Sequence, residues 1–463
     1  MAEAQAKFLS GSLFRHVSVM SLTASVGLMA VFAVDFIDMI FIAMLGKAEL
    51  AAAIGYAGAI LFFTTSFSIG MAIAVGALVA RALGAGDTAL AEERTAHGLV
   101  YGIVLGSLFA LGVWLFVDPL VRLLGASDQT ADLAAMYLRI VVPSLPLLLV
   151  GMMGGAILRA HGDARRAMMA TIYGGGVNLV LDPILIFGLD LELVGAALAS
   201  VAARVAIAGT ALLPILRHHG GIPRPKRAGL VRDFQPILAI AFPAILTQLA
   251  TPVGQAIVTR NMAQFGEEAV AAMAIVARLI PVSFGVIFAL SGAVGPIIGQ
   301  NFGAKDFDRV RRGYNAALLF TALVIVLISA VLFLLRAPIA DLFDAQGEMR
   351  DLLYLFCGPL ALLFFFNGVL FVSNAAFNNL GHPFYSTFMN WGRNTIAMIP
   401  AVWLGAAWFG AGGVLIGQAV AGVVFGAIAW LLALRVIAAG GAEEPRDGFA
   451  RQGRLHALLN LRR

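Results

Sequence analysis

Three aspartates stand in long apolar segments of the chain, where a charged side chain is costly. Asp35 and Asp38 belong to the segment VFAVDFIDMIFIAMLG, Asp182 belongs to GGGVNLVLDPILIFGL, and neither segment holds any other charge. An ionisable residue inside a membrane segment costs several kcal/mol unless it meets a polar or aqueous lining, so it indicates an ion or proton pathway. The three carboxylates therefore predict a cation or proton site.

The elements that would position these acids are membrane-spanning helices. The chain has 463 residues, of which 60% are hydrophobic and 12% charged, and its mean hydropathy is +0.92. These values exclude a soluble globular protein. Because a crossing needs about 20 helical residues, the apolar runs predict about twelve transmembrane helices. We therefore expect an all-α polytopic membrane protein. The single cysteine, Cys357, excludes an internal disulfide.

Basic residues orient these helices, because loops on the cytoplasmic side collect Lys and Arg. Arg165 and Arg166, the stretch 217–233 and Arg309 to Arg312 fall on one side, whereas opposite loops are poor in bases or rich in acids. Both termini should then be cytoplasmic, in a bacterial-type inner membrane. The net charge of +5 reflects these loops. We expect contact with the lipid bilayer and no nucleic-acid partner, since no soluble domain presents a basic surface.

The chain divides into two similar halves. The segment 79–98 aligns with 298–317 at an offset of 219 residues, matching Gly84 to Gly303 and Asp87 to Asp306, and Gly162 matches Gly381 at the same offset. We expect each Asp to cap a helix or brace a loop. The expected organisation is an N-lobe at 1–216, a cytoplasmic linker at 217–234, a C-lobe at 235–436 and a basic tail at 437–463. Six helices separate the copies, so the lobes are parallel repeats around a central cleft.

Depth along the helices gathers the candidate site in the outer half of the N-lobe. At about 1.5 Å per residue, Asp38 and Asp182 lie at similar distances from the outer turns. We place three further polar side chains at this level: Asn178, Ser200 and Tyr137. Such oxygen ligands could hold a proton or a sodium ion, and Asp35 could relay protons.

Each member of this set also has a structural alternative. Asp38 and Asp182 could be permanently protonated and join helices, and the same alternative stands for Asp35. Tyr137 could belong to the interfacial belt of aromatic residues, and Asn178 or Ser200 could simply join helices.

These residues carry a family resemblance over nearly the whole chain. The segments IDMIFIAMLGKAELAAAIG, ALVARALGAGD, AILRAHGDARRAMM and NLVLDPILIFGL resemble the N-lobe of the multidrug and toxic compound extrusion (MATE) family. The resemblance implies twelve helices in two lobes with alternating access. It also implies export of amphiphilic, often cationic compounds against a proton or sodium gradient. On it, Asp38, Asn178, Asp182 and Ser200, with Tyr137, match the cation-site positions.

The C-lobe resembles one branch of that family. No acid occurs in AFPAILTQLATP, with Gln248 and Thr251, or in FFFNGVLF, with Asn367. This resembles the branch typified by DNA-damage-inducible protein F (DinF-like), whose coupling rests on the N-lobe and is usually with protons. Arg393, in the middle of an expected helix, could line the cleft, or it could snorkel or bind a backbone carbonyl. We assign these four residues to a candidate substrate cleft.

The function predicted is proton-coupled multidrug efflux, with small organic substrates and no cofactor. Sodium coupling at Asp38, Asn178, Asp182 and Ser200 is the alternative ion; no other metal site is expected. A lipid-linked precursor flippase should show extra helices or a basic cavity, and an ion channel should show pore symmetry or a filter sequence. An enzyme is disfavoured, because no Ser-His, Cys-His or metal cluster lies at one depth.

Overall fold

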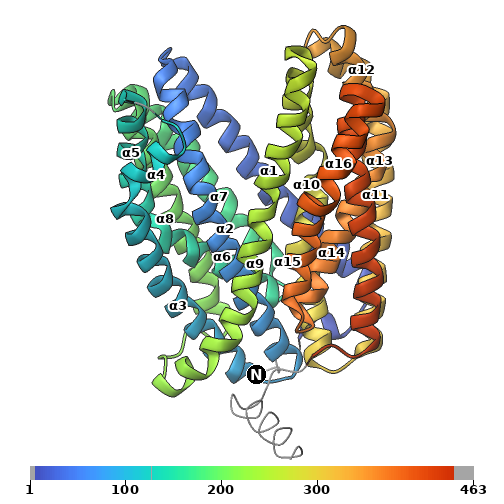
Figure 1. Cartoon of the computed structure of the whole chain (residues 1–463). Helices are drawn as coiled ribbons and strands as arrows, with labels where there is room; N and C mark the ends of the chain where they lie inside the picture. The colour runs from blue at the N-terminus through green and yellow to red at the C-terminus, as the bar shows by residue number, and fades with distance from the viewer. Residues whose placement is uncertain (1–5, 127, 443–463) are drawn as a thin grey trace, which may run out of the picture.

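Long apolar helices joined by short turns make up the chain (Figure 1). The structure is a computed structural model that describes residues 6–126 and 128–442. Over these residues it contains helices and no strand. The predicted fold class is confirmed. Most of the expected basic tail, 443–463, lies outside the described residues.

The N-lobe contains α1 to α8, with three short 3-10 or π segments. Its elements are η1 (Lys7–Leu9), α1 (Leu13–Met44), α2 (Ala48–Gly84), α3 (Thr88–Leu115), α4 (Val117–Leu123), α5 (Asp128–Val141), η2 (Val142–Ser144), α6 (Leu145–Ala160), α7 (Ala164–Pro183), η3 (Ile184–Gly188) and α8 (Glu192–His218).

The C-lobe contains α9 to α16, also with three short segments. Its elements are α9 (Arg227–Met262), η4 (Ala263–Phe265), α10 (Glu267–Gly303), α11 (Phe307–Leu342), α12 (Gly347–Leu355), η5 (Phe356–Leu360), α13 (Ala361–Leu363), α14 (Phe365–Asn379), α15 (Pro383–Trp391), η6 (Gly392–Ala397) and α16 (Met398–Ala438).

The number of crossings agrees with the sequence. Within the described residues ten helices are long and apolar enough to span a bilayer, and the bent pair Gly347–Leu363 and Phe365–Asn379 makes an eleventh. The span Pro383–Ala438 holds two crossings, because α16 leaves the helical conformation at Phe409 and Gly410. Gly410 has φ 60°, and Gly413 then packs directly on Gly405, so the chain turns back on itself.

The two lobes meet at one end of the molecule and diverge toward the other (Figure 1). We call the end near the N-terminus the base and the opposite end the top. At the base α2 and α10 cross at the two glycines that the repeat aligns. A Cβ added to Gly84 would lie 1.9 Å from the Gln300 carbonyl oxygen, and one added to Gly303 would lie 2.0 Å from that of Arg81. Only glycine permits this approach of two backbones.

Hydrogen bonds between the lobes reinforce the crossing. The Gln300 side chain donates to the Ala160 carbonyl (2.8 Å) and accepts from the Phe8 amide (2.8 Å). Arg81 of α2 donates to the carbonyls of Asn379 (3.0 Å) and Asn378 (2.9 Å) at the end of α14. The base is therefore a polar, closely packed contact that joins both lobes to the N-terminal segment.

The first helix of each lobe starts on the opposite lobe. Leu13, Val17 and Met20 of α1 belong to the buried cluster of the C-lobe. Ile237 and Ile240 of α9 belong to the buried cluster of the N-lobe. At the base, α1 therefore packs against the C-lobe and α9 packs against the N-lobe.

The turn residues act as the sequence predicts. Asp87 accepts a hydrogen bond from the Leu90 amide (2.9 Å) at the start of α3, and Asp306 accepts one from the Arg309 amide (2.8 Å) at the start of α11. Both are N-caps. The capping prediction is confirmed, and it holds at equivalent positions of the two copies.

The linker is shorter than expected, because α9 begins at Arg227 and not near residue 235. Asp233, expected in the linker, therefore lies inside a helix and is 1% exposed. Its Oδ2 lies 2.6 Å from Nδ1 of the buried His97 on α3, and its Oδ1 accepts from Arg232 (2.9 Å). This ion-paired cluster pins the start of the C-lobe to the N-lobe.

Candidate functional site

An amide on α7 joins two of the predicted acids, which come from different helices. The Asn178 side chain donates to both carboxylate oxygens of Asp38 on α1, each at 3.3 Å. It also donates to Oδ2 of Asp182, one turn further along α7, at 2.5 Å. The Asp38 and Asp182 carboxyl groups interact with each other as well. We call Asp38, Asn178 and Asp182 the acid cluster.

The local sequence explains how α7 presents Asp182. Pro183 follows it directly and cannot donate a backbone hydrogen bond, so the α-helix ends there and continues as the π turn η3. Asn178 and Asp182 are four residues apart and share one helix face. Turns of this kind are common at functional sites.

Two of the three side chains of the acid cluster are buried away from solvent. Asp182 is 1% exposed and Asn178 6% exposed. The Oδ1 atom of Asp182 is buried and has no hydrogen-bond partner within the described residues. Two like-charged carboxylates at close range repel, so the arrangement favours a proton or cation held between them.

The other expected members lie around the cluster without bonding to it. Asp35, one turn before Asp38 on α1, is exposed and acts on Asp38 through charge alone. The Tyr137 hydroxyl of α5 and the Ser200 hydroxyl of α8 are 3.5 Å apart, at the limit of a hydrogen bond. The charges of the acid cluster reach Tyr137, but no bond joins them.

Sequence reasoning missed Arg204, which lies one turn after Ser200 on α8. Its guanidinium donates to the Val141 carbonyl (3.0 Å) and the Ser144 hydroxyl (3.0 Å), and its charge acts on Tyr137. A lone cation in the apolar run VAARVAIAGTALL was a signal that could have found it.

The four candidate cleft residues of the C-lobe separate into two groups. Arg393 of η6 donates through Nη1 to the side-chain oxygen of Asn367 on α14. On α9, Gln248 is half-buried and Thr251 exposed. In the described part of the chain, neither Gln248 nor Thr251 forms a hydrogen bond with Arg393 or Asn367.

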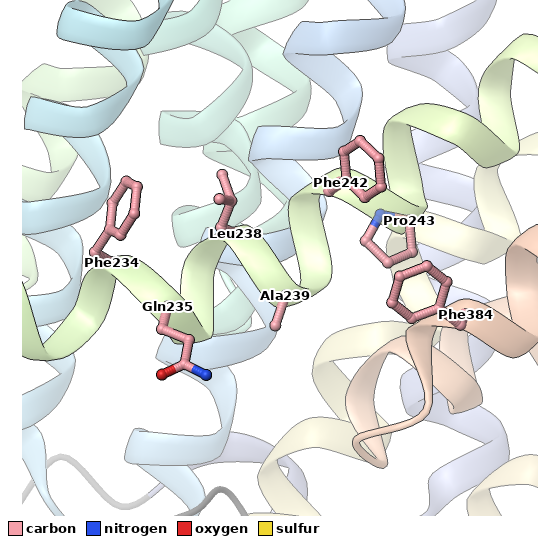
Figure 2. A pocket seen from close by; sticks show the side chains of 7 residues that line it. All are labelled: Phe234, Gln235, Leu238, Ala239, Phe242, Pro243 and Phe384. Carbon is pink, nitrogen blue, oxygen red and sulfur yellow. The ribbon is translucent and has the colours of Figure 1, made fainter. Parts of the chain in front are cut away.

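A separate apolar hollow lies on the C-lobe and includes none of these residues. Figure 2 shows it on α9 and α15, where Phe384 lies beside Pro243 at the bend of α9. Its lining residues are Phe234, Gln235, Leu238, Ala239, Phe242, Pro243 and Phe384. It offers no charged group and no predicted site residue. Elsewhere in residues 6–126 and 128–442, no three His, Cys, Asp or Glu side chains are grouped as metal ligands would be.

Comparison with known proteins places this geometry in context. The family model MatE matches residues 24–184 and 243–404, two ranges that begin 219 residues apart, which is the offset of the repeat. A protein of Shewanella oneidensis named FAD transporter is 30% identical over 92% of this chain and 96% of its own length. The multidrug export protein MepA of Staphylococcus haemolyticus is 25% identical over 88% of this chain and 90% of its own length.

Solved structures share the fold. A variant of the Vibrio cholerae MATE transporter VcmN superposes with a TM-score of 0.87 at 25% identity, covering 92% of this chain and 97% of that one. A multidrug resistance MATE family transporter in an outward-facing conformation superposes with a TM-score of 0.87 at 22% identity, covering 94% and 98%.

Proposed function

Because the chain belongs to the MatE family, whose members are transporters rather than enzymes, we propose that it is a proton-coupled antiporter that exports small organic compounds. The observation that carries the coupling is the acid cluster. The half-buried Asp38 and the buried Asp182 share one amide donor, and Asp182 keeps an unpartnered oxygen. Such a site can take up and release one proton or a small cation.

The proposed cycle uses the two ends of the molecule in turn. The base carries most of the basic turns, including Arg81 and Arg165, so we assign it, with both termini, to the cytoplasmic side of an inner membrane. The described conformation, closed at the base, is then the outward-open one. A proton entering from the top neutralises the acid cluster and weakens binding of an outgoing cationic substrate. The protonated carrier then returns inward and discharges its proton.

The energy available suits such a cycle. One proton that crosses a potential of 100 mV releases about 2.3 kcal/mol, enough for tens-fold accumulation of an uncharged substrate without a pH gradient. Sodium coupling is the alternative, because Asp38, Asn178 and Asp182 offer hard oxygen ligands. The test below separates the two ions.

The relatives suggest two substrate classes. The MepA relatives are named for multidrug export, which supports the amphiphilic, often cationic drugs that the family resemblance implies. The Shewanella relative is named FAD transporter, which supports a second candidate, export of a flavin nucleotide. Assignment to the DinF-like branch stays a prediction.

The test is dye efflux from proteoliposomes driven by a pH gradient alone or a sodium gradient alone. We expect proton-driven export that is lost in Asp38→Asn and Asp182→Asn, because an amide does not bind and release a proton in the pH range of the assay. Asp132→Asn, at an exposed acid of α5, is the matched control and should export normally. Proton-driven export retained in Asp38→Asn would refute the coupling site, sodium-only export would replace the ion, and no export under either gradient would favour a lipid flippase.

A further inference from the structure

The N-terminal segment, residues 7–11, lies at the base where the two lobes meet. It contains η1 and precedes α1, and the side chain of Phe8 is 1% exposed. The segment forms hydrogen bonds with α10 and α11 of the C-lobe and with the turn that follows α6 of the N-lobe. A segment that contacts both lobes at the closed end must release one of them when that end opens.

The C-lobe holds this segment at several points. Arg309 of α11 donates through Nη2 to the carbonyls of Phe8 (2.8 Å), Ser10 (3.1 Å) and Gly11 (3.3 Å). Asn301 of α10 donates to the Phe8 carbonyl (3.3 Å) and accepts from Nε of Arg309 (3.0 Å). Phe8 also belongs to the buried cluster of the C-lobe. The segment is therefore fixed mainly to the C-lobe.

Lys7 carries the contact of the segment with the N-lobe. Its Nζ donates to the Gly162 carbonyl, in the turn after α6, at 2.8 Å. Its carbons pack over the same glycine, because a Cβ added to Gly162 would lie 2.5 Å from Cδ of Lys7. Carbonyls at the end of a helix lack partners within the helix, and the negative end of the helix dipole favours a cation there. Lys7 thus places on the end of α6 a charge that the C-lobe holds in position.

Gln300 of α10 links the segment to the N-lobe a second time. Its side chain is fully buried, accepts from the Phe8 amide (2.8 Å) and donates to the Ala160 carbonyl at the end of α6 (2.8 Å). The Phe8 amide therefore satisfies the buried oxygen of Gln300 and orients its NH2 group toward Ala160. In the closed base, loss of either bond leaves a buried polar group unpaired, whereas water replaces the lost partner once the base opens. These bonds therefore stabilise the closed base specifically.

We propose that residues 7–11 form a latch that moves with the C-lobe and closes the base by binding the end of α6. This inference rests on the proposed transport function, because the latch must release once in each cycle. The bonds to the Gly162 and Ala160 carbonyls break when the base opens. The bonds from Arg309 and Asn301 to the latch persist, since both partners belong to the same lobe.

The first experiment measures the separation of the lobes in the full-length protein and does not require transport. Spin labels at Thr88 and Asp308, the exposed starts of α3 and α11, report the base by double electron–electron resonance. We expect Lys7→Ala to raise the ratio of open to closed bases about fivefold, the effect of one net hydrogen bond. Lys226→Ala is the matched control and should leave the ratio unchanged. Lys226 is the counterpart of Lys7 at the offset of 219 and is exposed at the N-cap of α9.

Gln300→Met tests the second link with a side chain of similar length that forms neither hydrogen bond. We expect the ratio of open to closed bases to rise about tenfold, because the Phe8 amide and the Ala160 carbonyl stay unpaired in the closed base. Thermal unfolding of each variant separates opening of the base from unfolding. An unchanged ratio in both Lys7→Ala and Gln300→Met would overturn the latch, and so would an equal rise in Lys226→Ala.

A cross-link tests which lobe the latch releases. A Cβ added to Gly162 would lie 3.2 Å from that of Lys7, close to the separation in disulfides of about 3.5–4.5 Å. We expect the oxidised Lys7→Cys/Gly162→Cys protein to stop exporting dye and a reductant to restore export. Gly381, the repeat counterpart of Gly162, provides the control, since a Cβ added to it would lie 3.0 Å from that of Ala442. This second cross-link lies on the C-lobe alone, so the oxidised Gly381→Cys/Ala442→Cys protein should export dye as fast as its reduced form.

Together these measurements separate the latch from the proposed transport function. Continued export by the fully cross-linked Lys7→Cys/Gly162→Cys protein would overturn the latch and leave the antiporter standing. A wild type that exports nothing under either gradient, with a base that opens in Lys7→Ala and Gln300→Met, would overturn the antiporter and leave the latch standing.

Discussion

Replacing Gly84 by alanine should force the base of the molecule open. The added Cβ would lie 1.9 Å from the Gln300 carbonyl oxygen and within 2.6 Å of two further backbone atoms of that residue. Backbone cannot rotate away as a side chain can, so α2 and α10 must separate by about 1.5 Å to restore an ordinary contact of 3.4 Å. Overpacking of this kind costs about 1–3 kcal/mol, and it acts only on the conformation that is closed at the base.

The assay is double electron–electron resonance between spin labels at Thr88 and Asp308, the exposed starts of α3 and α11. We expect Gly84→Ala to shift the population toward longer distances and to slow transport. Gly303→Ala should do the same, since its Cβ would lie 2.0 Å from the Arg81 carbonyl. Gly112→Ala, with nothing within 4 Å, is the control. Unchanged distances and transport in Gly84→Ala would refute the reasoning.

Two further predictions concern a loop and the candidate site. Asp163, the N-cap of α7, lies outside the spans; burial alone would raise its pKa, but hydrogen bonds from Arg166 and His219 hold that pKa below its usual range. Asp163→Ala should cost about 1 kcal/mol. Because the folded pKa is lowered, this stabilisation is complete above about pH 4 and is lost as the pH falls through the folded value. Thermal unfolding of both proteins at neutral pH and near pH 3 checks this, and an equal difference at both would contradict it. Tyr137→Phe should slow proton-driven efflux less than tenfold, because the hydrogen bond that it removes, to Ser200, is 3.5 Å long. A loss of efflux as complete as that of Asp38→Asn would contradict this expectation.

Patterns along one helix were predictable from the sequence, and contacts between helices were only partly so. The caps at Asp87 and Asp306 depend on local turns and are confirmed. Asn178 and Asp182 are one turn apart, and depth correctly placed Asp38 beside them. The depth of a residue in the membrane does not determine which way its side chain points, however. Tyr137 and Ser200 therefore share the depth of the acid cluster without bonding to it.

Charged residues near the ends of the spans were the hardest to interpret. Asp233 reads as a linker residue until α9 is seen to begin at Arg227 and to bury it against His97. Arg159 reads as a basic residue of a turn, yet its guanidinium extends upward to the boundary between the lobes. Long flexible side chains and helix starts depend on tertiary packing, which hydropathy does not encode.

The bonds of the N-terminal segment also determine when folding can finish. The backbone of Phe8 forms hydrogen bonds with the side chains of Gln300 and Arg309, residues 292 and 301 positions away. At about 5–20 residues per second, the ribosome needs about 15–60 s to reach those partners after the segment has emerged. During that time the lower half of α1 lacks the C-lobe residues that bury it. Assembly of the base must therefore be among the last steps of biogenesis, and a nascent chain stalled before residue 300 would leave its own beginning unpaired.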